Sequence, residues 1–245
     1  MLTLGLDLST ANAKTAACVL DWNTGPDCRA AHLSLGHGDD ALLALMAQAD
    51  AVGIDAPFGW PDAFRGTIDG WSERDEWPLG MPRSELRFRL TDDALRSKGR
   101  TPLSVSADRI AATAMRCAEL LARHCAAQGE GLDRVSGHAV EVYPAATLVA
   151  WEFDVRGYKD AAATEQRRRI AERLDQEARL GLPDEAIGAC SATDHVLDAL
   201  VASLTVRAHA LGLTHPPPSL QAAQVAREGW IQLPVPDSLP RLSGP

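Results

Sequence analysis

Four separate segments of the chain carry acidic residues in or beside apolar stretches. Asp7 lies within "LTLGLDLST", Asp55 ends "AVGID", and Glu141 lies within "HAVEVYP". In the fourth segment, "ATDHVLDALVAS", Asp194 and Asp198 are four residues apart. An unpaired charge in an apolar interior costs several kcal/mol, so acids in buried strands need an explanation.

A bound divalent cation would supply that explanation. Carboxylate oxygens are the hard ligands that Mg2+ and Mn2+ prefer. Asp194 and Asp198 share one face of a predicted helix, where like charges repel unless a cation lies between them. We therefore expect Asp7, Asp55, Asp194 and Asp198 to be metal ligands, and these four residues together with Glu141 to be the catalytic acids.

Each acid also has an ordinary structural explanation. Asp55 could accept backbone N–H groups where its strand stops, and Asp7 could cap the following turn. Glu141 could point to solvent from an edge strand. Asp194 and Asp198 could line an exposed helix face. The metal interpretation is favoured because four elements each contribute an acid in an order that can bring them together.

The periodicity of apolar residues predicts the elements that would position these acids. Three strand-like runs at residues 2–10, 14–22 and 27–35, separated by turn residues, predict an antiparallel meander. Helical spacing at 39–49, with acidic residues in its first turn, precedes the strand that ends at Asp55. The first third of the chain is therefore strand, strand, strand, helix, strand.

The rest of the chain is mainly helical. Residues 57–82 show little periodicity, whereas 106–129 predict a long amphipathic helix with Gly129 near its C-cap. "HAVEVYPA" predicts a strand that Pro144 closes. Further helices are expected at about 162–180, 193–212 and 218–228, before a short terminal strand, "GWIQLP". We predict one α/β domain over residues 1–245, with an irregular insertion at about 57–105.

Composition limits the partners that the chain can attract. It has 245 residues, 46% of them hydrophobic, a formal net charge of −9 and a pI of about 5.2. An acidic protein has no general attraction to nucleic acid or to anionic membranes. With no signal-like start and no 18-residue apolar stretch, we expect a cytoplasmic protein without membrane partners. Five scattered cysteines have no zinc-site spacing.

A local basic segment at residues 83–100 contrasts with the acidic total. It contains Arg83, Arg87, Arg89, Arg96, Lys98 and Arg100 against Glu85, Asp92 and Asp93. This excess of positive charge favours a polyanion site, and the alternative is a solvated helix with ion pairs four residues apart. The tryptophans just before it, Trp60, Trp71 and Trp77, could stack on bases or form a small local core.

Several short blocks resemble a known family. "GLDLS", "GIDAPFGWP", "RFRLTD", "EVYPA", "GYK" and "ATDHVLDALVAS" are similar to the signature blocks of the family called domain of unknown function 429. The blocks run from residue 5 to about 203. Members are described as predicted nucleases of the ribonuclease H-like superfamily. The resemblance implies a ribonuclease H-like fold, in which helices flank a five-stranded mixed sheet whose first three strands are antiparallel.

The resemblance also implies roles for individual residues. Similar enzymes such as Holliday-junction resolvases place one acid on the first strand, one on the fourth, and a pair on a late helix. Those positions match Asp7, Asp55, Asp194 and Asp198 here, and Glu141 is a further acid in the family's fifth-strand block.

These observations predict a metal-dependent phosphodiester hydrolase, a nuclease that acts on DNA or RNA. Two Mg2+ or Mn2+ ions about 3.5–4 Å apart would activate water and stabilise the leaving oxygen. We expect Arg83, Arg87, Arg89 and Lys159 to bind the substrate. Arg83 and Arg87 lie in the basic segment at residues 83–100, and Arg89 and Lys159 lie in the resembling blocks "RFRLTD" and "GYK".

Two other functions are compatible with the sequence. One is a non-catalytic module on the same fold that binds a nucleotide or a partner protein through residues 57–100. The other, which the sequence supports less, is an ATP-using enzyme of the actin and sugar-kinase type, because "DLST" at 7–10 resembles its first phosphate loop. That architecture normally repeats the fold twice, and the chain contains neither a second phosphate loop nor a GxxxxGK[ST] motif.

Overall fold

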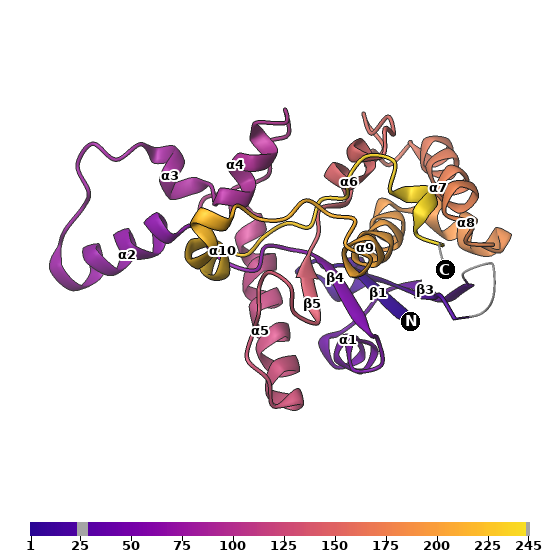
Figure 1. The fold of residues 1–245 in the computed structure, drawn as a ribbon, viewed down its shortest axis with the longest axis horizontal. Helices are drawn as coiled ribbons and strands as arrows, with labels where there is room; N and C mark the ends of the chain where they lie inside the picture. The colour runs from indigo at the N-terminus through magenta and orange to yellow at the C-terminus, as the bar shows by residue number, and fades with distance from the viewer. Residues whose placement is uncertain (24–28, 244–245) are drawn as a thin grey trace.

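A five-stranded mixed sheet lies at the centre of the computed structural model, which describes residues 1–23 and 29–243 (Figure 1). The strands are β1 (Leu2–Asp7), β2 (Ala16–Asp21), β3 (Arg29–Leu35), β4 (Ala51–Asp55) and β5 (Ala139–Glu141), in the order β3-β2-β1-β4-β5. β1, β2 and β3 pair antiparallel, whereas β4 pairs parallel with β1 and with β5. The predicted α/β class with a five-stranded mixed sheet is confirmed. Residues 27 and 28 of the predicted third strand lie outside the described residues.

The described residues also form ten α-helices, some of which cover the two faces of the sheet. They are α1 (Asp39–Met46), α2 (Asp62–Arg74), α3 (Arg83–Arg87), α4 (Leu90–Arg96), α5 (Ile110–Gln128), α6 (Pro144–Ala150), α7 (Thr164–Ala178), α8 (Asp184–Ala192), α9 (Asp194–Ala210) and α10 (Ala222–Glu228). One face packs on α1 and α5 through a buried cluster that includes Leu4, Leu6 and Ile54. The opposite face packs on α9, with α7 and α8 beyond it.

Strand alternation assigns the acids to these faces. Because successive side chains point to opposite sides, Leu4 and Leu6 face α5 while Gly5 and Asp7 face α9. In the same way, Asp55 lies on the α9 side of β4, two residues after Gly53. Two strand ends therefore present an acid to the same helix.

Two glycines allow α9 to lie directly on the strands. A Cβ atom on Gly5 would lie 2.1 Å from the carbonyl oxygen of Ala199, and one on Gly53 would lie 2.6 Å from that of Ala202. Any side chain at these positions would push the helix off the sheet. The helix is therefore held at a distance that only glycine permits.

The segment between β4 and α5 was expected to be irregular, and instead it contains three helices. α2 and α3 extend away from the sheet as an arm, and α10 packs against α2 and α4 (Figure 1). On this arm Trp71 and Trp77 pack edge to face, with ring centroids 6.2 Å apart, and both stay about half exposed. Trp60 is half-buried.

The predicted terminal strand "GWIQLP" is wrong. Ile231 makes only an isolated parallel bridge to Glu141. The segment cannot extend because Gly229 has a φ of 87° and Pro234 lacks an N–H for a ladder.

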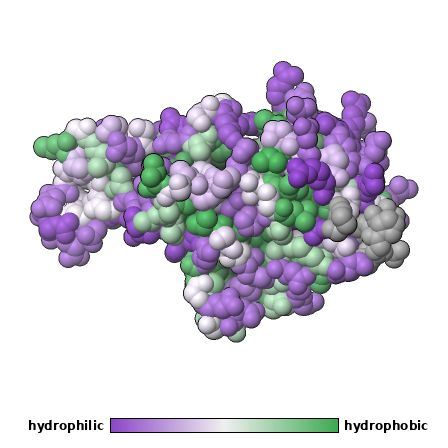
Figure 2. Space-filling model, viewed as in Figure 1, coloured by the Kyte–Doolittle hydropathy of each residue, from purple (hydrophilic) through white to green (hydrophobic). Residues whose placement is uncertain are grey.

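The exposed surface is mixed in character. Most of the face seen in Figure 2 is hydrophilic, with hydrophobic residues gathered in small patches. None of the described helices combines the length and the apolar character that crossing a bilayer requires.

The close packing of α9 generates a test. We expect Gly5→Ala to lower the free energy of unfolding by about 3 kcal/mol, because the new methyl group would meet helix backbone that cannot move independently. The matched control is Gly66→Ala in α2, where an added Cβ has no neighbour within 4 Å. That change should stabilise by about 0.5–1 kcal/mol. Urea denaturation measures the free energy of unfolding of both variants, and equal changes at the two sites would contradict the close packing of α9 on β1.

Candidate metal centre

Three carboxylates from three elements meet beside the sheet. Asp7 ends β1 and Asp55 ends β4, and the two residues are register partners across the parallel pair. Asp198 lies in α9, one turn after the helix begins, where the side chain of Thr193 accepts the N–H of His195 as a cap. One oxygen atom from each carboxylate lies within 4.8 Å of the other two. The three acids are hereafter called the carboxylate triad.

Polar neighbours form hydrogen bonds with only some of the triad's carboxylate oxygens. Tyr158 donates its hydroxyl to Oδ1 of Asp198 at 2.8 Å, and Nδ1 of His195 lies 2.6 Å from Oδ2 of Asp7. Nζ of Lys159 lies 2.6 Å from Oδ2 of Asp198, but this oxygen accepts no hydrogen bond of good geometry. The carboxylate of Asp55 accepts none from the described residues. The triad therefore keeps oxygens that a further ligand can use.

The pKa shifts within the triad follow from burial and from crowded negative charge. Burial raises the pKa of Asp55 well above its usual value; Lys159 opposes this shift, and Asp7 and Asp198 add to it. Burial likewise raises the pKa of Asp198, to about 6, again against the opposing charge of Lys159. A cation here would favour the charged forms of these acids.

These properties fit a hard divalent cation. The donor set consists of carboxylate oxygens, which Mg2+ and Mn2+ prefer, and two of the three acids have oxygens without a hydrogen bond. His195 is fixed against Asp7, and the pKa of its imidazole is raised chiefly by this hydrogen bond. The triad could therefore hold Mg2+ or Mn2+, with His195 and Tyr158 orienting two of its ligands.

Two of the predicted catalytic acids are not part of the triad. Asp194 is half-buried at the first residue of α9, one helical turn of about 5.4 Å before Asp198, and it does not join the group. Glu141 pairs with Ile54 in the sheet register, and its carboxylate is not one of the three that converge, although it lines the same cavity as Asp55. The register of β5 keeps Glu141 out of the triad, and the rise of the helix keeps Asp194 out of it.

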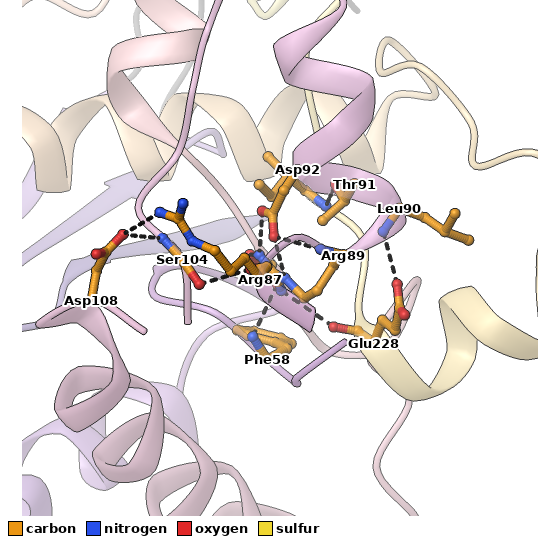
Figure 3. Close-up of polar contacts among 11 residues, drawn as sticks. Phe58, Arg87, Arg89, Leu90, Thr91, Asp92, Ser104, Asp108 and Glu228 are labelled. Carbon is orange, nitrogen blue, oxygen red and sulfur yellow. Dashed lines mark hydrogen bonds and ion pairs between the residues drawn. The ribbon is translucent and has the colours of Figure 1, made fainter. Parts of the chain in front are cut away.

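Arg89 holds Glu141 and Asp92 in a buried ion cluster, and Figure 3 shows Arg89 beside Asp92. Its guanidinium donates two hydrogen bonds to Asp92, two to Glu141 and one to the carbonyl of Glu228. Phe58 donates its N–H to Glu141 as well. Arg89 is 2% exposed, and all five of its N–H groups have protein acceptors. The expectation that Arg89 binds substrate is therefore corrected, because it has no donor left for a phosphate.

The remaining predicted cations occupy different places. Arg83 and Arg87 are exposed on α3, and Arg87 pairs with Asp108 at 3.9 Å and lies over the ring of Phe88. A cavity lies beside the triad, lined by Asp55 and Lys159 among others, and neither Arg83 nor Arg87 lines it. Of the four cations expected to bind substrate, only Lys159 forms an ion pair with a described carboxylate of the triad.

Two residues of the site were missed by sequence reasoning. His195 was not predicted as a site residue, although its spacing of three residues from Asp198 places both on one side of α9. Tyr158 precedes Lys159 in the block "GYK", which carried no signal beyond the lysine. Both come from segments far from Asp7 in the sequence, so only the fold brings them to it.

Comparison with known proteins identifies a family but no activity. A family model described as "Protein of unknown function (DUF429)" matches residues 5–222, so the chain belongs to this family. No significant match was found among curated proteins or among solved structures.

The triad generates a prediction about metal binding. We expect Asp7→Asn, Asp55→Asn and Asp198→Asn each to weaken Mn2+ binding by about tenfold or more, because each removes a charged ligand. Asp194→Asn is the matched control on the same helix and should leave affinity unchanged. Titration calorimetry measures all four variants. An equal loss in the control would point to general electrostatics instead of a defined site.

The Arg89 cluster generates a prediction about stability. Arg89→Met would leave Glu141 and Asp92 buried without a counter-charge, which should cost about 3–5 kcal/mol. Arg96→Met removes a more exposed pair with Asp93 and should cost less than about 1 kcal/mol. Urea denaturation distinguishes the two variants. If Arg89→Met folded as stably as wild type, the structural role of Arg89 would be refuted.

Proposed function

We propose that this member of the DUF429 family is a metal-dependent phosphodiester hydrolase, a nuclease that acts on DNA or RNA. The observation that carries the proposal is the convergence of Asp7, Asp55 and Asp198, with oxygens within 4.8 Å of one another, beside a cavity that Lys159 also lines. Hydrolysis of a phosphodiester needs an activated water and neutralisation of developing negative charge. A carboxylate triad next to a cavity can hold a metal ion that would activate the water and neutralise the developing charge.

The arrangement of the sheet supports a ribonuclease H-like fold for this activity. Three antiparallel strands come first and two parallel strands follow, in the order β3-β2-β1-β4-β5. The resemblance of the sequence blocks implies the same arrangement, with acids on the first strand, the fourth strand and a late helix. Asp7, Asp55 and Asp198 occupy those three elements.

Bound Mg2+ or Mn2+ would activate a water molecule and, as a pair of ions, stabilise both the attacking and the leaving oxygens. The residues of the chain prepare the site for this. Tyr158 fixes the orientation of Asp198, and His195 fixes that of Asp7. Lys159 balances part of the triad's charge, and its half-exposed side chain also lines the cavity.

The activity test uses bis(p-nitrophenyl) phosphate and single- and double-stranded DNA and RNA, each with Mn2+ or Mg2+. We expect cleavage that EDTA abolishes and that Asp55→Asn lowers by about 100-fold or more, since loss of a metal ligand removes several kcal/mol of transition-state stabilisation. Asp194→Asn should retain the wild-type rate.

Two results would contradict the proposal. Cleavage that survives both EDTA and Asp55→Asn would place the chemistry elsewhere. Metal-independent binding of nucleotides, with no turnover of any of these substrates, would favour the non-catalytic binding module instead.

A further inference from the structure

A cavity of about 560 Å3 opens beside the carboxylate triad. Asp55, Tyr158 and Lys159 line it, and so do residues 100–103, Arg109 and Ile110. Its volume lies within the range of about 300–1,000 Å3 that is typical of small-molecule sites. The cavity is therefore large enough for one compact organic ligand that reaches the triad.

Arg100 lines this cavity with most of its hydrogen-bonding capacity unused. Nη2 donates to the carbonyl of Ala145 at 3.0 Å, while Nε is shut off from solvent and donates to no acceptor in the described part of the chain. Arg100 also forms no ion pair with any described residue, in contrast to Arg89, whose five N–H groups are all taken. A guanidinium is always charged, so a half-buried one without a carboxylate favours an anion from outside.

The other lining residues include charged side chains of both signs and apolar side chains. Arg109 is exposed, lines the cavity and makes no ion pair with the described residues. Pro102, Leu103, Ile110 and Val155 add apolar surface, here called the apolar wall. A ligand that suits this lining carries a negative charge and an apolar ring.

Tyr143 lines the same cavity as Asp55, Lys159 and Arg100. Burial raises the pKa of its hydroxyl, with Asp55 adding to the shift and Lys159 and Arg100 opposing it. An anion at Arg100 would therefore lie in a cavity that Asp55 of the triad and an aromatic side chain also line.

We propose that this cavity binds a single nucleotide unit, with its phosphate at Arg100 and its base against the apolar wall. The inference rests on the proposed function for the chemistry at the triad, and it names the substrate class of that site. The unit is either a free nucleotide or the terminal nucleotide of a single strand, since both offer the same phosphate, sugar and base.

The test measures binding of adenosine 5′-monophosphate, adenosine and a 5′-phosphorylated single-stranded pentanucleotide by calorimetry in EDTA. Working without metal separates this inference from the nuclease proposal, which fails or succeeds on metal-dependent turnover. We expect the monophosphate to bind about 10- to 100-fold more tightly than adenosine, and Arg100→Gln to remove that difference. Arg96→Gln, a change at an arginine outside the cavity, should preserve it.

A second variant guards against misfolding of the first. Leu103→Trp would fill the apolar wall without touching the charge at Arg100, and it should weaken binding of both adenosine and the monophosphate. Equal affinity for the monophosphate and the pentanucleotide supports a free nucleotide, and tighter binding of the pentanucleotide supports a strand end. The inference is overturned if wild type fails to bind the monophosphate at millimolar concentration, or if both cavity variants bind it as wild type does.

Discussion

The direct contact of α9 with β1 and β4 is the constraint on which the rest of the structure depends. Gly5 and Gly53 remove the side chains that would separate helix and sheet, so backbone meets backbone at Ala199 and Ala202. Strand alternation then places Asp7 and Asp55 on the same face, two residues after the glycines. Asp198 enters from the helix just before the contact with Gly5. The sheet, the glycines and the triad therefore form one geometric unit.

The buried acids separate into two groups that differ in how fully their charge is compensated. Glu141 and Asp92 share a guanidinium whose donors are all used, so this cluster is a closed structural unit. Asp198 pairs with one partly exposed ammonium, that of Lys159, and both Asp55 and Asp198 keep oxygens that accept no hydrogen bond from the described residues. Breaking a satisfied buried pair costs several kcal/mol, whereas a site left under-compensated is suited to bind a cation. This contrast indicates a structural role for the first group and supports the proposed metal-binding role of the second.

Sequence patterns predict much of this architecture because their signals are local. The strands that end at Asp7 and Asp55 are short apolar runs bounded by turn residues, and the blocks around them carry the family resemblance. The sequence could not choose between Asp194 and Asp198, because both share a helix face and only the height of the helix over the sheet separates them. The sequence could not place Glu141 for a similar reason, because the side of the sheet on which Glu141 lies depends on the pairing of β5 with β4. Arg89 and Arg100 lie in one basic segment, and only the fold shows which one has its partners.

We propose that the triad is a divalent-cation site that opens onto an anion-binding cavity. Anomalous diffraction from crystals soaked in Mn2+ tests this proposal most directly. We expect a manganese peak bounded by Asp7, Asp55 and Asp198, at the oxygen distances of about 2.0–2.2 Å that small hard cations adopt. The proposal would be contradicted if crystals in millimolar Mn2+ gave no such peak and Nζ of Lys159 still contacted Asp198.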